Sequence, residues 1–266
     1  SVVIDNINFF MKNRSECVMN EKNFSEIICG RNPVIEALKA GKPIDTLYMS
    51  GSGGSLGHIS SLARTNGVVV KNVSEQKLSQ LSGGAVHQGV VAIGSYAEYV
   101  SVEDILAVSK KKGTNPFIII CDEIEDPHNL GAIIRTAESA GADGLIIPKR
   151  RSATLSQTVY KTSAGAASWL PVARVSNLAT TIDMLKANGV WIYGTDAEGE
   201  NYDGVDLRGS MALIIGSEGF GMGRLIREKC DFLLRLPMYG KITSLNASVA
   251  AGIFMYEAVR QRNKPV

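Results

Sequence analysis

Polar side chains interrupt an otherwise apolar segment in the middle of this 266-residue chain. The segment 126–141 reads DPHNLGAIIRTAESAG, and it places Asn129 and Arg135 among small and branched apolar residues. We expect Asn129 to cap a helix that begins at the next leucine, with Arg135 about two turns further along. A buried guanidinium without a partner would be strongly destabilising, so Arg135 must either reach water along its apolar stem or meet an anion.

A glycine-rich loop follows an apolar run later in the chain. The loop GSEGFGMG contains Gly216, Gly219, Gly221 and Gly223, and Glu218 lies inside it. Glycines allow a backbone to approach a ligand closely, and one interpretation of such a loop is the dinucleotide site of an oxidoreductase. However, the loop lies near the end of its domain, and Glu218 would repel a pyrophosphate. A cofactor with a positive centre fits this loop better.

A third polar segment, 236–246, precedes the last predicted helix. Ser244 or Asn246 can cap that helix, since both residue types accept hydrogen bonds from free N–H groups of a first turn. The helix opens with small residues, namely Ala247, Ser248, Ala250, Ala251 and Gly252. Such a helix can pack closely against another backbone or a ligand.

The elements that position these segments form an α/β pattern. Short apolar runs without alternating polarity predict strands buried on both faces, at 117–124, 144–148, 191–196, 211–219 and 232–238. Helices are expected between them, at about 129–140, about 154–165, 177–189, 223–229 and about 246–262. This order predicts a doubly wound parallel sheet, and ligands bind outside the carboxyl ends of such strands, where the three polar segments lie.

The upstream sequence predicts a separate, smaller domain. Residues 24–98 read as a small α/β unit, in which Asn32 is expected to cap a first helix and Pro33 to lie in its first turn. Residues 99–115 begin as a helix and then take the composition of a linker, and residues 1–23 read as an arm. The second domain then spans residues 116–266.

Composition excludes several classes of protein. The chain is 45% hydrophobic and 20% charged, and it has no apolar run that could span a membrane and no recognisable secretory signal. Cys17, Cys29, Cys121 and Cys230 lack CxxC spacing, and the three histidines are scattered. We therefore expect neither a metal site nor disulfides, and a cytoplasmic location.

A basic stretch indicates a polyanionic partner. No Asp or Glu occurs from Gly144 to Ile182, and the basic residues of that span are Lys149, Arg150, Arg151, Lys161 and Arg174. A stretch that carries only positive charges attracts nucleic acid. The alternative is that acidic residues from elsewhere in the fold pair with these side chains.

Three motifs in this order and spacing resemble those of a known family. The stretches NLGAIIRTAESAG (129–141), IIGSEGFGM (214–222) and LPMYGKITSLNASVAAG (236–252) resemble the SpoU family of RNA 2′-O-ribose methyltransferases, in the SPOUT superfamily. The resemblance covers residues 118–262 nearly end to end. Upstream, GRNPVIEAL (30–38) and HQGVVA (87–92) resemble the small RNA-binding domain fused to the rRNA branch of that family.

This resemblance implies a fold and a cofactor. The second domain would be a SPOUT domain whose C-terminal segment threads a trefoil knot, and two protomers would pack their knots together as a homodimer. S-adenosylmethionine would be held in a bent shape by the knot loops. The cofactor-binding residues implied by motif position are Thr195, Gly216, Leu236, Met238, Ser244, Leu245 and Asn246.

The resemblance also implies a reaction. A ribose 2′-hydroxyl would attack the sulfonium methyl group, and no metal is needed because the methyl donor is already activated. Arg135 would be the catalytic residue, surrounded by Asn129, Glu218, Ser244 and Asn246. Since arginine hardly ever loses its proton in proteins, we favour an electrostatic clamp over a general base.

The substrate follows from the same branch. We expect a guanosine ribose of large-subunit (23S) rRNA, with tRNA as the alternative substrate. Expected RNA contacts are Arg31, Asn32, His87, Gln88, Lys149, Arg150 and Arg151, each of which could instead be a cap or turn residue or a paired charge. Weaker alternatives are an RNA-binding protein without activity and the dinucleotide-dependent oxidoreductase named above.

Overall fold

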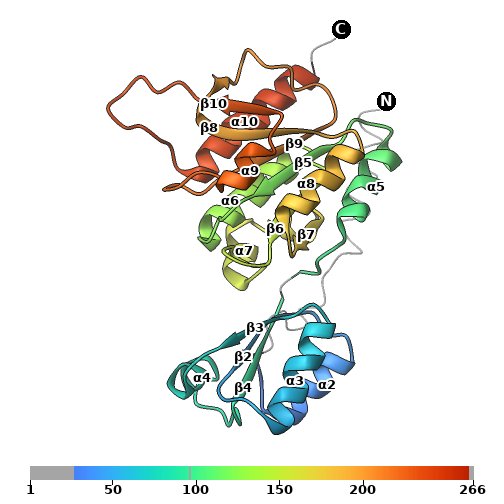
Figure 1. Cartoon of the computed structure of the whole chain (residues 1–266), viewed down its shortest axis with the longest axis vertical. Helices are drawn as coiled ribbons and strands as arrows, with labels where there is room; N and C mark the ends of the chain where they lie inside the picture. The colour runs from blue at the N-terminus through green and yellow to red at the C-terminus, as the bar shows by residue number, and fades with distance from the viewer. Residues whose placement is uncertain (1–26, 96, 264–266) are drawn as a thin grey trace.

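Two α/β domains follow one another along the chain (Figure 1). The computed structural model describes residues 27–95 and 97–263. The predicted arm, 1–23, lies outside the described residues. Within the described part of the chain, no helix has the length and apolar composition needed to cross a bilayer.

The N-terminal domain is a four-stranded mixed sheet with helices. Its elements are β1 (Ile27–Cys29), α2 (Arg31–Lys39), β2 (Ile44–Met49), α3 (Gly54–Thr65), β3 (Val69–Asn72), α4 (Glu75–Leu81) and β4 (Val90–Gly94). The strand order is β1-β4-β2-β3, where β4 pairs antiparallel with both neighbours and β2 pairs parallel with β3. Its core includes Val34, Leu47 and Ile59, which have no exposed surface. The strand β1 was not expected, because three residues are too short to show a pattern.

The helix α2 begins two residues earlier than expected. Its N-cap is Gly30, and no side chain caps it, so the prediction that Asn32 caps this helix was wrong. Gly30 has a φ of 94°, which favours glycine. Asn32 instead lies exposed in the first turn.

The C-terminal domain is built on six parallel strands. They are β5 (Phe117–Cys121), β6 (Gly144–Pro148), β7 (Val172–Val175), β8 (Trp191–Asn201), β9 (Met211–Ile215) and β10 (Phe232–Arg235), in the order β10-β8-β9-β5-β6-β7. The five predicted strands are confirmed. The sixth, β7, was missed because four residues that include Arg174 do not form an apolar run.

Helices cover both faces of this sheet. One face carries α6 (Pro127–Ser139), α7 (Gln157–Thr162) and α10 (Ala247–Arg262), which share a core with Ile119, Leu145 and Leu213. The other carries α5 (Val102–Lys112), α8 (Leu178–Ala187) and α9 (Arg224–Glu228), which pack with Ile118, Ile146 and Ile214. The doubly wound parallel architecture is thereby confirmed. The trefoil knot implied by the resemblance stays a prediction.

The segment 99–115, expected to be a linker, contains the helix α5. Ser101 caps this helix in a reciprocal capping box with Asp104, and Gly113 ends it with a φ of 67°. Val102 and Ile105 are buried in the core of the C-terminal domain. The segment is therefore part of that domain's packing as well as a connection.

Candidate active site

The polar segments identified from the sequence meet at the carboxyl edge of the six-stranded sheet. One follows β5, one follows β9, and one follows β10. The strands β5 and β9 lie side by side, and the helix after β5 covers one face while the helix after β9 covers the other. A crevice is expected where connections leave a parallel sheet toward opposite faces.

The helix α6 begins earlier than the sequence pattern indicated. Its N-cap is Asp126, whose Oδ1 accepts from the His128 N–H at 2.9 Å, and Pro127 occupies the first turn. The prediction that Asn129 caps this helix was wrong, because Pro127 has a φ suited to a helix start and lacks the N–H that a first position does not need. The side chain of Asn129 is therefore free for other contacts.

A carboxylate holds the three segments together. Glu218 Oε1 accepts hydrogen bonds from Asn129 Nδ2 at 2.9 Å, from Asn246 Nδ2, and from the Ala247 N–H at 3.3 Å. Asn246 Nδ2 also donates to Asn129 Oδ1 at 2.9 Å. One charged side chain from the glycine-rich loop thus joins the first turn of α6 to the start of α10.

Asn246 also caps the last helix, as predicted. Its Oδ1 accepts from the N–H groups of Ser248 at 2.9 Å and Val249 at 3.3 Å. Its two side-chain atoms therefore serve different purposes, since the oxygen caps α10 and the nitrogen binds Glu218 and Asn129. The carboxylate of Glu218 also lies at the N-terminus of α10, where the helix dipole favours negative charge.

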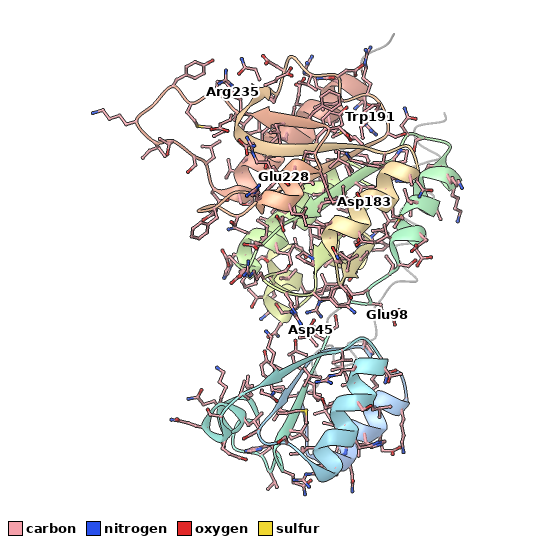
Figure 2. The ribbon with its side chains drawn as sticks, viewed as in Figure 1. Asp45, Glu98, Asp183, Trp191, Glu228 and Arg235 are labelled. Carbon is pink, nitrogen blue, oxygen red and sulfur yellow. The ribbon has the colours of Figure 1, made fainter. Side chains whose placement is uncertain are left out.

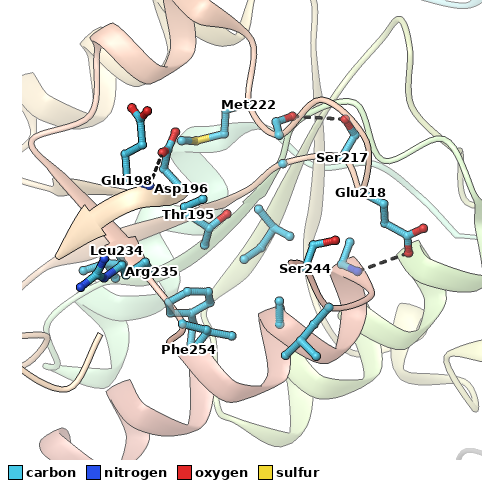
Figure 3. Close-up of a pocket in the computed structure, with 18 of the residues that line it drawn as sticks. Thr195, Asp196, Glu198, Ser217, Glu218, Met222, Leu234, Arg235, Ser244 and Phe254 are labelled. Carbon is cyan, nitrogen blue, oxygen red and sulfur yellow. Dashed lines mark hydrogen bonds between the residues drawn. The ribbon is translucent and has the colours of Figure 1, made fainter. Parts of the chain in front are cut away.

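A cavity of about 500 Å³ adjoins this network (Figure 3). It is lined by six of the seven residues expected to bind a cofactor, namely Thr195, Gly216, Leu236, Met238, Ser244 and Leu245. Glu218 lines it as well, and Asn246 reaches it through Glu218. Leu234 and Phe254 give it an apolar floor between the strands and α10.

Gly216 allows the glycine-rich loop to fold back on itself. Ser217 and Gly221 exchange backbone hydrogen bonds of 2.9 and 3.0 Å across the turn. A Cβ at position 216 would lie 2.4 Å from the Gly221 carbonyl carbon, closer than real side chains approach. Any side chain there would displace the loop that carries Glu218.

A charged cluster that was not predicted from the sequence lies at the rim of this cavity. Arg227 Nε donates to Asp196 Oδ2 at 2.7 Å, and its Nη2 donates to Glu198 Oε2 at 2.9 Å. Burial would raise the pKa of Asp196, but the hydrogen bond and charge of Arg227 and the Glu198 N–H together lower it below its usual value. Asp196 ends the predicted strand 191–196, so its place at a carboxyl end was the available signal.

Asp122 is a second residue that the sequence analysis missed. This buried side chain follows β5, and its Oδ2 accepts from the Gly223 N–H at 2.8 Å, which ties the end of the glycine-rich loop to the centre of the sheet. Burial raises the pKa of Asp122, an effect that the Gly223 hydrogen bond partly opposes. Asp122 therefore acts on the loop rather than facing the cavity.

Arg135 lies on the exposed side of α6. Among the described residues it has no hydrogen-bond or ion-pair partner, so its guanidinium is available to a ligand. It lies six residues beyond Asn129, which is about 9 Å along a helix axis. The guanidinium therefore lies at the surface of α6, where both water and an anion can reach it.

The basic stretch is only partly free. Arg151 Nη1 donates to Glu123 Oε1 at 2.8 Å, and Arg174 is buried in an ion pair with Asp45. Arg150 is exposed, and no acidic side chain of the described residues pairs with it or with Lys149. Two charges of the stretch are thus paired within the fold, as the alternative expected, and the attraction of nucleic acid stays a prediction.

Three of the expected RNA contacts lie together in the N-terminal domain. Arg31 and His87 line a cavity of about 430 Å³, together with Gln88 and Glu75. Arg31 donates from Nε to the Gln88 carbonyl at 3.0 Å, and the Gln88 side chain accepts from the Arg31 N–H at 3.2 Å. His87 Nδ1 accepts from the Gly89 N–H at 3.1 Å, so the proton of a neutral ring lies on Nε2.

No group of three or more His, Cys, Asp or Glu side chains comes close enough to hold a metal ion in residues 27–95 and 97–263. The described cysteines, Cys29, Cys121 and Cys230, are free thiols.

Comparison with known sequences matches both domains. Residues 116–256 match the model of the SpoU rRNA Methylase family, and residues 27–100 match the model "RNA 2′-O ribose methyltransferase substrate binding". The YacO protein of Bacillus subtilis, named as a TrmH family tRNA/rRNA methyltransferase, is 48% identical over 241 residues, which cover 90% of this chain and 96% of that protein. A Staphylococcus aureus protein with the same family name is 45% identical over 240 residues, 89% of this chain and 96% of its own.

Solved structures show the same fold. The SpoU methyltransferase AviRb from Streptomyces viridochromogenes, in complex with the cofactor AdoMet, aligns with a TM-score of 0.58 at 26% identity, over 93% of this chain and 96% of that one. An AdoMet-bound rRNA methyltransferase from Sinorhizobium meliloti aligns with a TM-score of 0.57 at 28% identity, over 89% and 87% of the two chains.

Proposed function

Because this chain belongs to the SpoU rRNA methylase family, we propose that it transfers a methyl group from S-adenosylmethionine to the 2′-hydroxyl of an RNA ribose. The observation that carries the proposal is the convergence of the three motifs on one cavity at the carboxyl edge of the sheet. Membership of this family leaves the dinucleotide-dependent oxidoreductase without support.

The residues around the cavity fit S-adenosylmethionine. Leu234, Leu236 and Phe254 offer apolar contacts to an adenine ring, and the carboxylate of Glu218 favours a cationic sulfonium. The cavity of about 500 Å³ lies within the size range of small-molecule sites. When bound, the cofactor supplies a methyl group that is already activated for attack, which is why no metal is required.

This chain's residues must then position and activate the ribose. Arg135 is the one free cation on the exposed side of α6 within the described helix, and a guanidinium matches the geometry of a phosphate. We assign it the clamp on the substrate phosphate and the stabilisation of negative charge developing on the 2′-oxygen. Glu218 orients Asn129 and Asn246, and Ser244 faces the same cavity.

For the substrate, we propose a guanosine ribose in large-subunit rRNA, with tRNA as the alternative. The N-terminal domain supports a substrate that reaches beyond the methyl-transfer site, because it adds a separate cavity lined by Arg31 and His87. Asn32 on the N-terminal domain and Arg150 on the C-terminal domain are both exposed and can donate hydrogen bonds to RNA. Lys149 lies at the boundary between the domains, since its Nζ is 3.6 Å from the place that a Cβ on Gly67 would occupy. A cytoplasmic location remains the expectation.

We also propose a homodimer. The helix α10 exposes Val249, Ile253 and Tyr256 at 52%, 37% and 50%, at the i, i+4, i+7 spacing of a single stripe. The loop 236–246, which leads into α10, exposes Tyr239 and Ile242 at 94% and 74%. A second copy would cover this surface and stabilise the loop that lines the cavity.

The test of the proposal is methyl transfer from labelled S-adenosylmethionine by the full chain. Deproteinised rRNA and tRNA serve as separate substrates, and ribose methylation is mapped by resistance to alkaline cleavage. Arg135→Ala is expected to lower kcat by about 100-fold or more while cofactor affinity by calorimetry stays within about twofold. Near-normal turnover in Arg135→Ala contradicts the assigned role, and label in a base rather than a ribose contradicts the proposed reaction.

A further inference from the structure

A buried ion pair crosses the boundary between the two domains. Arg174 on β7 donates from Nη1 to Asp45 Oδ1 at 2.9 Å and to the Asp45 carbonyl oxygen at 3.2 Å. Each of the two side chains is only 8% exposed. Figure 2 shows Asp45 at the edge of the N-terminal domain that faces the C-terminal domain.

Tyr99 completes this contact from the segment that joins the domains. Its hydroxyl donates to Asp45 Oδ1 at 3.3 Å and accepts from the Leu155 N–H at 3.0 Å. The Arg174 guanidinium lies 5.4 Å from the centre of the Tyr99 ring, within the range of a cation–π contact. Burial raises the pKa of Tyr99, so this hydroxyl keeps its proton and remains a donor to Asp45.

The geometry opposes hinge motion at this boundary. Domains in one chain usually move relative to one another unless the interface holds them. Here separation would break the ion pair between Asp45 and Arg174 and the hydrogen bond between Tyr99 and Asp45. The backbone adds to this, because Val100 donates to the Val172 carbonyl at 2.9 Å and forms a parallel bridge with Ala173.

The ion pair is not optimised for stability alone. Arg174 Nε is buried and has no hydrogen-bond partner among the described residues. A buried ion pair with an unsatisfied N–H is often no more stable than apolar residues of the same volume. The pair instead fixes the orientation of the two domains relative to each other.

The boundary is connected to the methyl-transfer site through the basic loop 149–155. The Lys149 N–H donates to the Val175 carbonyl, next to Arg174, at 2.8 Å, and the Leu155 N–H donates to Tyr99. Both ends of the loop are therefore held at the domain boundary. Between them, Arg151 pairs with Glu123, one residue after the Asp122 that holds the glycine-rich loop.

We propose that Asp45 and Arg174 are positioning residues for the RNA substrate. The pair fixes the orientation of the N-terminal domain and of the basic loop, so that an RNA held by that domain presents one ribose to the methyl-transfer site. The proposal rests on the proposed function, and it concerns neither the cofactor nor the chemical step. Substrate selection then depends on a fixed spacing between two domains.

The experiment compares Arg174→Met, which keeps the apolar stem and removes the charge, with a matched control. Lys112→Ala is the control, because Lys112 Nζ pairs at 2.8 Å with Asp143, a buried carboxylate inside the C-terminal domain. Both variants leave one buried carboxylate without its cation, but only Arg174→Met does so at the boundary. Asp45→Asn is a conservative variant, since its Oδ1 still accepts from Arg174 and Tyr99.

For each full-length variant, kcat and KM for RNA, the Kd for S-adenosylmethionine and the radius of gyration in solution are measured below the melting temperature. Arg174→Met is expected to lower kcat/KM for RNA by about tenfold or more, chiefly through KM, with the cofactor Kd unchanged. Its radius of gyration should increase. Asp45→Asn should retain part of the wild-type kcat/KM for RNA, and Lys112→Ala should retain nearly all of it.

The possible results separate this proposal from the proposed function. Wild-type turnover in Arg174→Met, or an equal loss in Lys112→Ala, overturns the positioning role and leaves the methyl-transfer assignment intact. A loss in Arg174→Met that follows the loss of cofactor binding also overturns it. If the wild-type protein methylates no RNA ribose, the proposed function fails, and the positioning role fails with it.

Discussion

Glu218 organises the candidate site at the scale of single residues. Its Oε1 accepts from two asparagine side chains and a backbone N–H, so one carboxylate oxygen joins segments that lie 89 and 28 residues away in the chain. Hydrogen bonds to a charged acceptor are stronger than neutral ones. The charge at the same time favours a cationic ligand in the adjoining cavity.

Replacing Glu218 by glutamine separates these two effects. Glu218→Gln keeps an acceptor oxygen for Asn129 and Asn246 but removes the charge, whereas Glu218→Ala removes both. We expect Glu218→Gln to lower kcat for methyl transfer by about tenfold, and Glu218→Ala by about 100-fold with weaker cofactor binding, because the loop then loses its attachment to α10. Single-turnover kinetics and calorimetry measure the two quantities. Equal activity in the wild type and Glu218→Ala contradicts this role.

At the scale of elements, the glycine-rich loop between β9 and α9 is shaped by contacts of its own backbone. A Cβ at position 216 would lie 2.4 Å from the Gly221 carbonyl carbon, whereas a Cβ at position 219 would meet no atom within 4 Å. Alanine has the same effect on chain entropy at both positions, so the two substitutions differ mainly in steric contact.

Gly216→Ala should therefore weaken cofactor binding while Gly219→Ala does not. We expect the Kd for S-adenosylmethionine to rise about tenfold or more in Gly216→Ala, since overpacking a tight turn moves the backbone that lines the cavity. Gly219→Ala should remain within about twofold of the wild type. Calorimetric titration of both variants gives the result, and similar affinities would show that the turn adapts without moving the site.

The elements also show which sequence patterns are informative. Long apolar runs predicted five of the six strands of the C-terminal domain, because strands buried on both faces exclude polar residues. The strand β7 was missed because Arg174 makes its ion pair with the other domain, a contact that no local pattern reveals. Asn129 is a residue type that often caps helices, but Asp126 caps α6 and Pro127 begins it, so the helix starts before the apolar pattern does.

The sequence predicts which residues form the candidate site, but it does not predict which of their side chains contact one another. Motif resemblance identified Asn129, Glu218 and Asn246, but the pairing of their side chains depends on how three distant loops fold. Asp196 and Arg227 belong to no motif used in the sequence analysis, and their ion pair appears only when β8 and α9 come together. Long-range side-chain contacts of this kind are set by tertiary packing.

At the scale of the whole molecule, α10 presents two different faces. One face, with Ala251, Phe254 and Met255, is buried in the core. Val249 and Ile253 are exposed, whereas Glu257 is buried and accepts from Arg260 Nε at 2.7 Å. An exposed apolar stripe on a helix whose other side is buried favours a partner molecule.

The exposed stripe on α10 predicts that the protein is a homodimer. A single charged substitution in the stripe should dissociate this dimer. Ile253→Asp places a carboxylate at the centre of the stripe, where a second copy would bury it without a partner, and the protein should become monomeric by light scattering at micromolar concentration. Val86→Asp is the matched control, since Val86 is 81% exposed on the other domain, and this variant should remain dimeric. Because the loop 236–246 leads directly into α10, the monomer should also bind S-adenosylmethionine more weakly, by about tenfold. A monomeric wild type, or an Ile253→Asp variant that remains dimeric, would show that α10 does not form the interface.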